Sequence, residues 1–190
     1  MAEKVLFGLS NVYVAERTET EGVVTYGTPV HMPGGVSLSL DPQGDSAKFF
    51  ADNTAFFATF ANNGYDADME VANVPAFFKT GYLGYIVDSA GKLVETNKTG
   101  KSFALLFQTE TDDNAIKYVL YNCSASRPSK EFNTTEDTVD PQPQALSLTV
   151  GGDEMADGSY AYIAECHYGD SEYAGFFTTA PTVPTVEVSA

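Results

Sequence analysis

The segment PGGVSLSLDPQGDSAKFFADN, residues 33–53, indicates the fold class. Val36, Leu38 and Leu40 alternate with serines, which is typical of a β-strand with one buried face. The turn-forming residues DPQG are expected to end this strand. The pattern returns in DPQPQALSLTV, residues 140–150, where leucines again alternate with small hydroxyl residues. We expect the two strands to lie in one sheet, without forming an internal repeat.

The whole chain fits this β pattern as a single domain over residues 1–190. Its 16 Gly and 9 Pro are spread along the chain, which is typical of short strands joined by turns. We therefore expect a mainly-β fold, an antiparallel β-sandwich or partial barrel with one short flanking α-helix. Residues 16–31 are expected to form a long hairpin or an extended loop, residues 126–143 a polar loop, and residues about 178–190 an extended tail.

Two local predictions concern the segment that follows the first alternating strand. Asp45 is placed to cap a short helix through residues 48–50. Residues 54–61 fit a helical stripe of phenylalanines and an alternating strand equally well. The Asn-Gly dipeptide that follows is a strong hairpin signal, so we predict strand 54–61 paired with strand 65–72.

The one real helix of the chain is predicted over residues 73–81. Asn73 would cap it, Pro75 lies in its first turn, and Gly81 would end it. Further strands are predicted in the segments 5–14, 82–87, 93–96, 103–109, 115–123, 145–150 and 159–168.

The charge of the chain is strongly negative, with a formal net charge of −16. Residues 131–190 hold 11 acidic residues and no Lys or Arg. Nucleic-acid binding by phosphate neutralisation needs the opposite sign, so it is excluded as a function. The acidity then either serves solubility alone or creates a surface that repels polyanions. No apolar run reaches the length of a membrane helix, and we expect neither a signal peptide nor a membrane anchor.

Three carboxylates alternate along the strand predicted over residues 65–72. Asp66, Asp68 and Glu70 share one face of this strand, and apolar residues occupy the other. Like charges in line repel one another unless their face is solvated. The face is therefore an ordinary solvent surface or an acidic wall that borders a water-filled space.

Motifs for catalysis, cofactors and metals are weak. Residues 99–102, TGKS, resemble the end of a phosphate-binding loop, but the required glycine is missing upstream and a strand-like segment follows. His31 and His167 have no second ligand nearby in sequence. Cys123 and Cys166 are expected to be free, buried thiols. We therefore predict no catalytic residue, no cofactor and no metal site.

The order of several sequence blocks resembles the major tail protein family of long-tailed phages (siphophages), the subunits of the tail tube. The blocks are PGGVSLSLDPQGDSAKFFADN, NNGYDADMEVANVPAFF, LGY, DSAGKLVETNKTGKSFALLFQTE and the Arg127-Pro128 pair after a long strand. The resemblance extends over essentially the whole chain, and none of its blocks is catalytic.

The resemblance implies a tail-tube fold and a structural, non-enzymatic role. Subunits of this kind form hexameric rings that stack into a hollow tube around a tape-measure protein. DNA passes through the lumen during ejection without specific binding. The protein would be made in the bacterial host cytoplasm and located in the virion tail, with Asp66, Asp68 and Glu70 facing the lumen. The alternative is a β-sandwich binding module, an adhesin or carbohydrate-binding domain, although the chain lacks Trp for a sugar platform.

Overall fold

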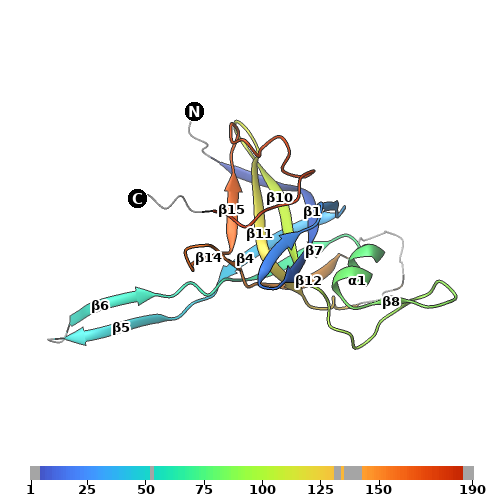
Figure 1. Cartoon of the computed structure of the whole chain (residues 1–190), viewed down its shortest axis with the longest axis horizontal. Coiled ribbons are helices and arrows are strands. Elements are labelled where there is room, and N and C mark those ends of the chain that lie inside the picture. Colours follow the sequence, from blue (N-terminus) through green and yellow to red (C-terminus); the bar gives the residue numbers. More distant parts are fainter. Residues whose placement is uncertain (1–4, 52–53, 131–133, 135–142, 186–190) are drawn as a thin grey trace.

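A large antiparallel sheet dominates the computed structural model, which describes residues 5–51, 54–130, 134 and 143–185. The sheet has nine strands, in the order β2-β1-β10-β11-β12-β7-β4, with β3 paired to β1 and β15 paired to β11 (Figure 1). The mainly-β prediction is therefore confirmed. The strands are β1 (Leu6–Thr20), β2 (Val23–Tyr26), β3 (Val30–His31), β4 (Gly35–Pro42), β5 (Ser46–Ala51), β6 (Thr54–Phe60), β7 (Tyr65–Val71), β8 (Ile86–Val87), β9 (Leu93–Val94), β10 (Phe103–Thr111), β11 (Ile116–Ala125), β12 (Gln144–Val150), β13 (Asp153–Glu154), β14 (Tyr160–Ala161) and β15 (Ile163–Cys166).

The middle of the sheet is buried on both faces. Along β10, Phe103 and Leu105 point into one hydrophobic cluster, whereas Ala104 and Leu106 point into a second. The first cluster lies between β10–β11 and the strands β12, β7 and β4. The second is covered by the C-terminal segment around residues 176–183. The arrangement is sandwich-like, and it explains why β10 reads as a continuous apolar run.

The sheet curls so that its β4 end returns toward β1. A Cβ atom at Gly35 would lie 2.9 Å from the Val12 Cγ2 atom, so glycine allows this close approach. Within the described residues the sheet ends at β2 and β4 and remains open. The two alternating strands of the sequence, β4 and β12, lie in this one sheet with β7 between them, as predicted.

The predicted helix forms as α1 (Ala76–Tyr82), but its predicted caps are wrong. Pro75 occupies the N-cap and makes no side-chain cap bond. Asn73 lies outside the helix, and Gly81 lies within it. Packing holds this short helix instead, because the Phe78 ring lies 5.3 Å from the Phe103 ring. None of the helices in the described residues is long and apolar enough to cross a membrane.

A two-stranded arm projects from the body of the molecule (Figure 1). It consists of β5 and β6, which pair with each other, so both the helix capped by Asp45 and the pairing of 54–61 with 65–72 are wrong. The backbone N–H of Gln43 bonds the Gly64 carbonyl at 2.8 Å, and the N–H of Ala61 bonds the Asp45 carbonyl at 3.0 Å. The β4–β7 ladder therefore continues outward into the arm.

The Asn-Gly dipeptide marks the base of this arm instead of a hairpin turn. Gly64 has φ 104°, and a Cβ atom there would overlap the carbonyl oxygen of Val150. Glycine is required because the chain passes close to β12, not because it reverses direction.

Several boundaries differ from the prediction. Strand β4 runs through Pro42 rather than ending before it, and Val36 is 53% exposed because the β4–β7 register shifts between Gly35 and Ser37. Residues 16–31 form the hairpin alternative, with β1 and β2 joined at the turn of Glu21 and Gly22.

The predicted polar loop at 126–143 falls partly outside the described residues, as does the end of the predicted tail. Residues 126–130 contain neither helix nor strand. Within the tail, the described residues to 185 pack against the sheet, where Val183 contacts the second hydrophobic cluster.

Candidate functional site: an acidic sheet face

Strand β7 presents three carboxylates on the outer face of the sheet. Asp66, Asp68 and Glu70 are exposed, as the alternation predicted. The residues between them are buried, with Ala67 2% and Met69 1% exposed. Burial of this apolar face against the first cluster fixes which way the carboxylates point, since a one-residue slip would exchange the two faces.

The neighbouring strands extend the same face with short polar side chains. Three cross-strand rows are formed by Asp41, Asp66 and Thr149, by Ser39, Asp68 and Ser147, and by Ser37, Glu70 and Ala145. None of these nine residues is Lys or Arg. The three rows carry four carboxylates and no cation, and we call this negatively charged surface the acidic face.

Neutral donors hold the carboxylates of the acidic face in place. The donors are Ser147 Oγ to Asp68 Oδ1 at 2.8 Å, Gln43 Nε2 to Asp66 Oδ2 at 2.8 Å, and Ser37 Oγ to Glu70 Oε2 at 3.1 Å. A hydroxyl or amide donor orders a carboxylate without cancelling its charge. The acidic face thus keeps its negative charge while its side chains are fixed.

A shallow hollow of about 590 Å³ continues the acidic face toward β11. Asp66 and Asp68 line it together with Ser124, Ser126 and Ser147. No group of three His, Cys, Asp or Glu side chains among the described residues is arranged to hold a metal ion. The chemistry on offer is a fixed array of solvated negative charges that repels other anions.

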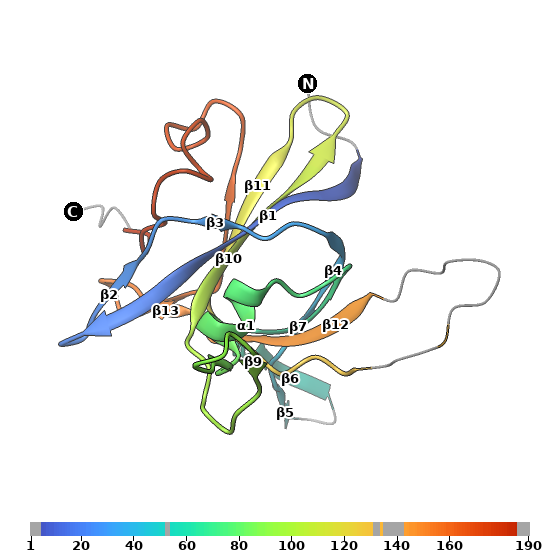
Figure 2. The same ribbon diagram turned by 90° about the vertical axis from the view of Figure 1, so that its right-hand side faces the viewer.

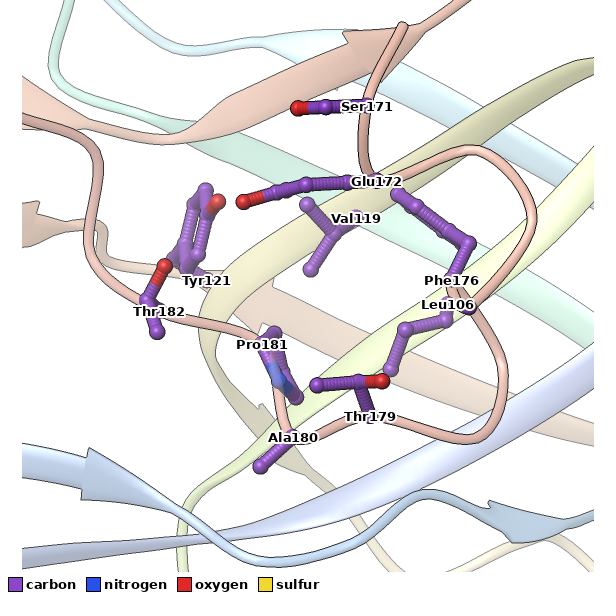
Figure 3. Close-up of a pocket in the computed structure, with 11 residues that line it drawn as sticks. Leu106, Val119, Tyr121, Ser171, Glu172, Phe176, Thr179, Ala180, Pro181 and Thr182 are labelled. Carbon is purple, nitrogen blue, oxygen red and sulfur yellow. The ribbon is translucent and has the colours of Figure 1, made fainter.

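A second hollow, of about 290 Å³, lies beneath the C-terminal segment on the opposite side of β10–β11 (Figure 3). Leu106 and Val119 form its floor, and Phe176 and Pro181 lie at its edge. Glu172 extends across it toward Tyr121. Burial, and then the charge of Glu172, raise the pKa of that tyrosine. Sequence reasoning missed this hollow, since only the Phe176-Phe177 pair hinted that the segment packs on the sheet.

A buried ion pair ties β13 to the first hairpin of the sheet. Asp153 is 1% exposed, and its Oδ1 accepts a hydrogen bond from Arg17 Nε at 2.8 Å and forms an ion pair with Nη2 at 2.7 Å. The Tyr26 hydroxyl donates to Oδ2 of the same carboxylate. Burial and this hydrogen bond raise the pKa of Tyr26. Asp153 lies 136 residues from Arg17 and 127 residues from Tyr26 in the sequence, so no local pattern could have revealed this network.

The histidines and cysteines do not gather into a site. The His31 ring lies 4.9 Å from the Tyr13 ring, and His167 Nε2 lies 3.5 Å from Glu165 Oε2. Both cysteines are free and buried, as predicted, and burial raises the pKa of the Cys123 thiol to about 12. The TGKS segment precedes strand β10 rather than a helix, so it lacks the helix N-terminus of a phosphate-binding loop.

Comparison with known proteins yields no family for this chain. No protein-family model matches it, and no curated protein matches it. The acidic face, the arm and the ordered sequence blocks are therefore the features that bear on function.

Proposed function

We propose that this chain is the structural subunit of a phage tail tube, which self-assembles into stacked hexameric rings through which DNA is ejected. The acidic face carries the proposal. Its three rows combine fixed carboxylates with short hydroxyl side chains and contain no cation. Such a surface repels phosphate and has no positive group that would bind DNA. Lining a lumen with this face would let DNA pass without specific binding.

The arm and the sheet edges support self-assembly. An isolated two-stranded ribbon is marginally stable in water, so β5–β6 would gain stability by packing on a neighbouring copy. The ends of the sheet at β2 and β4 offer backbone groups that a neighbouring subunit would cover or extend. Ring number, the tape-measure partner and the location in the virion tail come from the family resemblance alone. The role is architectural and not enzymatic.

Two experiments test the proposal. Negative-stain microscopy of concentrated protein should show rings or tubes, and particles that stay monomeric at every concentration and salt would reject it. For the lumen assignment, Asp66, Asp68 and Glu70 should be replaced together by Lys. Tubes should still form, whereas DNA delivery should fall. Normal delivery by the triple variant would refute a lumenal acidic face. A triple reversal of Asp112, Asp113 and Glu165 to Lys controls for the change in net charge.

The alternative binding-module function is favoured by one observation, the hollow beneath the C-terminal segment (Figure 3). Its apolar floor and its single carboxylate, Glu172, suit a small ligand with an apolar body and a donor group. A thermal-shift screen with sugars and small amphiphiles would support this function if a ligand raised Tm in the wild type but not in a Glu172→Ala variant.

A further inference from the structure

The hairpin β8–β9 exposes an aliphatic patch. Val87 is 60% exposed, and Ile86, Leu93 and Val94 are each 37–38% exposed. The hairpin turn is ordered by Asp88, whose Oδ1 accepts hydrogen bonds from the backbone N–H groups of residues 90 and 92 at 2.9 and 2.8 Å. A preformed hairpin with four exposed aliphatic side chains is a candidate interaction surface.

Positive charge is concentrated in the sequence near this patch, although the chain as a whole is acidic. Six of the ten Lys and Arg lie within residues 79–101 and 127–130, against two acidic residues, Asp88 and Glu95. Glu95 is already engaged by Lys130 Nζ at 2.5 Å. Lys92 and Lys98 form no ion pair with another described residue. The β8–β9 hairpin therefore carries an apolar patch with two cations, Lys92 and Lys98, close to it in the sequence.

A groove of complementary character lies between the β1–β2 hairpin and the β13–β14 hairpin. It encloses about 510 Å³. Val23 and Tyr160 line it and are 63% and 52% exposed. Glu154 supplies a carboxylate on its wall and forms no ion pair with another described residue, whereas Glu19 is paired with Arg17, which also lines the groove. The groove thus offers exposed apolar surface beside negative charge.

We infer that the β8–β9 hairpin of one copy docks into this groove of a second copy, an inference that rests on the proposed self-assembly. Aliphatic side chains would meet Val23 and Tyr160, while Lys92 and Lys98 would meet Glu154. Figure 1 shows β8 near one end of the molecule and β14 on the other side of the body, with the β5–β6 arm extending beyond it. Contact between two different surfaces is heterologous, so each added copy leaves one hairpin and one groove free for the next.

A second copy is the occupant that the charges favour. Two chains of net charge −16 repel each other unless their contact brings opposite charges together. The β8–β9 end is the positive region of this chain, and the groove carries carboxylates on the side remote from it. An unrelated acidic partner would leave the groove without a role.

A charge-swap experiment tests the contact. The variants are Lys92→Glu, Glu154→Lys and the double variant, with sedimentation velocity used to find the concentration at which each begins to assemble. Each single variant should raise this concentration about tenfold at low salt, and the double variant should return to within about threefold of wild type. Glu165→Lys is a matched control with the same charge change as Glu154→Lys at a site outside the groove. Unchanged Tm values establish that every variant is folded.

The outcomes separate this contact from the proposed function. A wild type that never assembles rejects both. A wild type that assembles, with single variants that assemble equally well, rejects the contact and leaves the tube function standing. Single variants that assemble poorly without recovery in the double variant also overturn the contact, because Lys92 and Glu154 would then act through different partners. The contact is supported only if the single variants assemble poorly and the double variant regains an assembly concentration near that of the wild type.

Discussion

Replacing Arg17 by Met should destabilise the fold by about 3 kcal/mol. The Arg17 side chain is 14% exposed and supplies one hydrogen bond and the ion-pair contact to the Asp153 carboxylate, whose side chain is 0% exposed. Its loss leaves a buried negative charge with the Tyr26 hydroxyl as the remaining donor. Breaking a buried pair in this way costs roughly 3–5 kcal/mol, and the slight exposure of Arg17 favours the lower end.

Urea and thermal unfolding measure this loss. A change of 1 kcal/mol shifts Tm by about 2–4 °C in a chain of this size, so the expected fall is about 6–12 °C. A double-mutant cycle with Asp153→Leu separates the pair from simple packing. The double variant should lose less free energy of unfolding than the sum of the two single variants, because it no longer buries an unpaired charge. Additive losses, or a loss below about 1 kcal/mol for Arg17→Met, would refute the reasoning.

Three further predictions use other parts of the fold. Burial raises the pKa of Cys123 from 9.0 to about 12, so a thiol reagent at pH 8 should react with it only after urea unfolds the chain. The same shift means that its contribution to stability is present below pH 9 and is lost as the pH rises toward 12, which urea unfolding at pH 8 and 10.5 should detect. Gly81→Ala should raise the free energy of unfolding by about 0.5–1 kcal/mol, because the added Cβ in the helix meets open space. Gly100→Ala should lower it by about 2 kcal/mol, because the added Cβ would overlap a backbone carbonyl. Equal effects of the two substitutions on the free energy of unfolding would contradict this prediction. Leu146→Ala should lower the free energy of unfolding by about 2–5 kcal/mol, whereas Val36→Ser should change it by less than about 0.5 kcal/mol. A larger loss of Tm for Val36→Ser than for Leu146→Ala would count against the observed burial.

Period-2 alternation predicted much of the sheet, because it depends on each strand's own burial. Strand β7 appears where the sequence placed it, with Asp68 outside and Met69 inside. Alternation failed at Val36, which is the extra residue of β4 at the register shift against Val71 and Glu70 of β7. No property of residues 33–53 alone encodes that shift.

Long-range geometry explains the larger errors. The Asn-Gly dipeptide indicates only that Gly64 needs a positive φ. A hairpin turn would require this, and the close approach to Val150 also requires glycine, so the dipeptide does not distinguish the two. The helix assigned to Asp45 failed because β5 has a pairing partner, β6, in the arm. The sequence predicted only part of the acidic face. The carboxylates of β7 follow from its alternation, whereas the hydroxyl residues of β4 and β12 join them only through strand pairing.

The continuous ladder from β4–β7 into the arm restricts how the arm can change in length. Backbone pairing between antiparallel strands repeats every two residues, so removing one residue from a single strand would shift the pairing of every later residue on that strand. Removing two residues from β5 and two facing residues from β6 would shorten the arm and keep the pairing of the remaining residues. The body would be unaffected, because the ladder below Gln43 and Gly64 keeps its partners. The arm is therefore an adjustable spacer whose reach comes in discrete, paired steps.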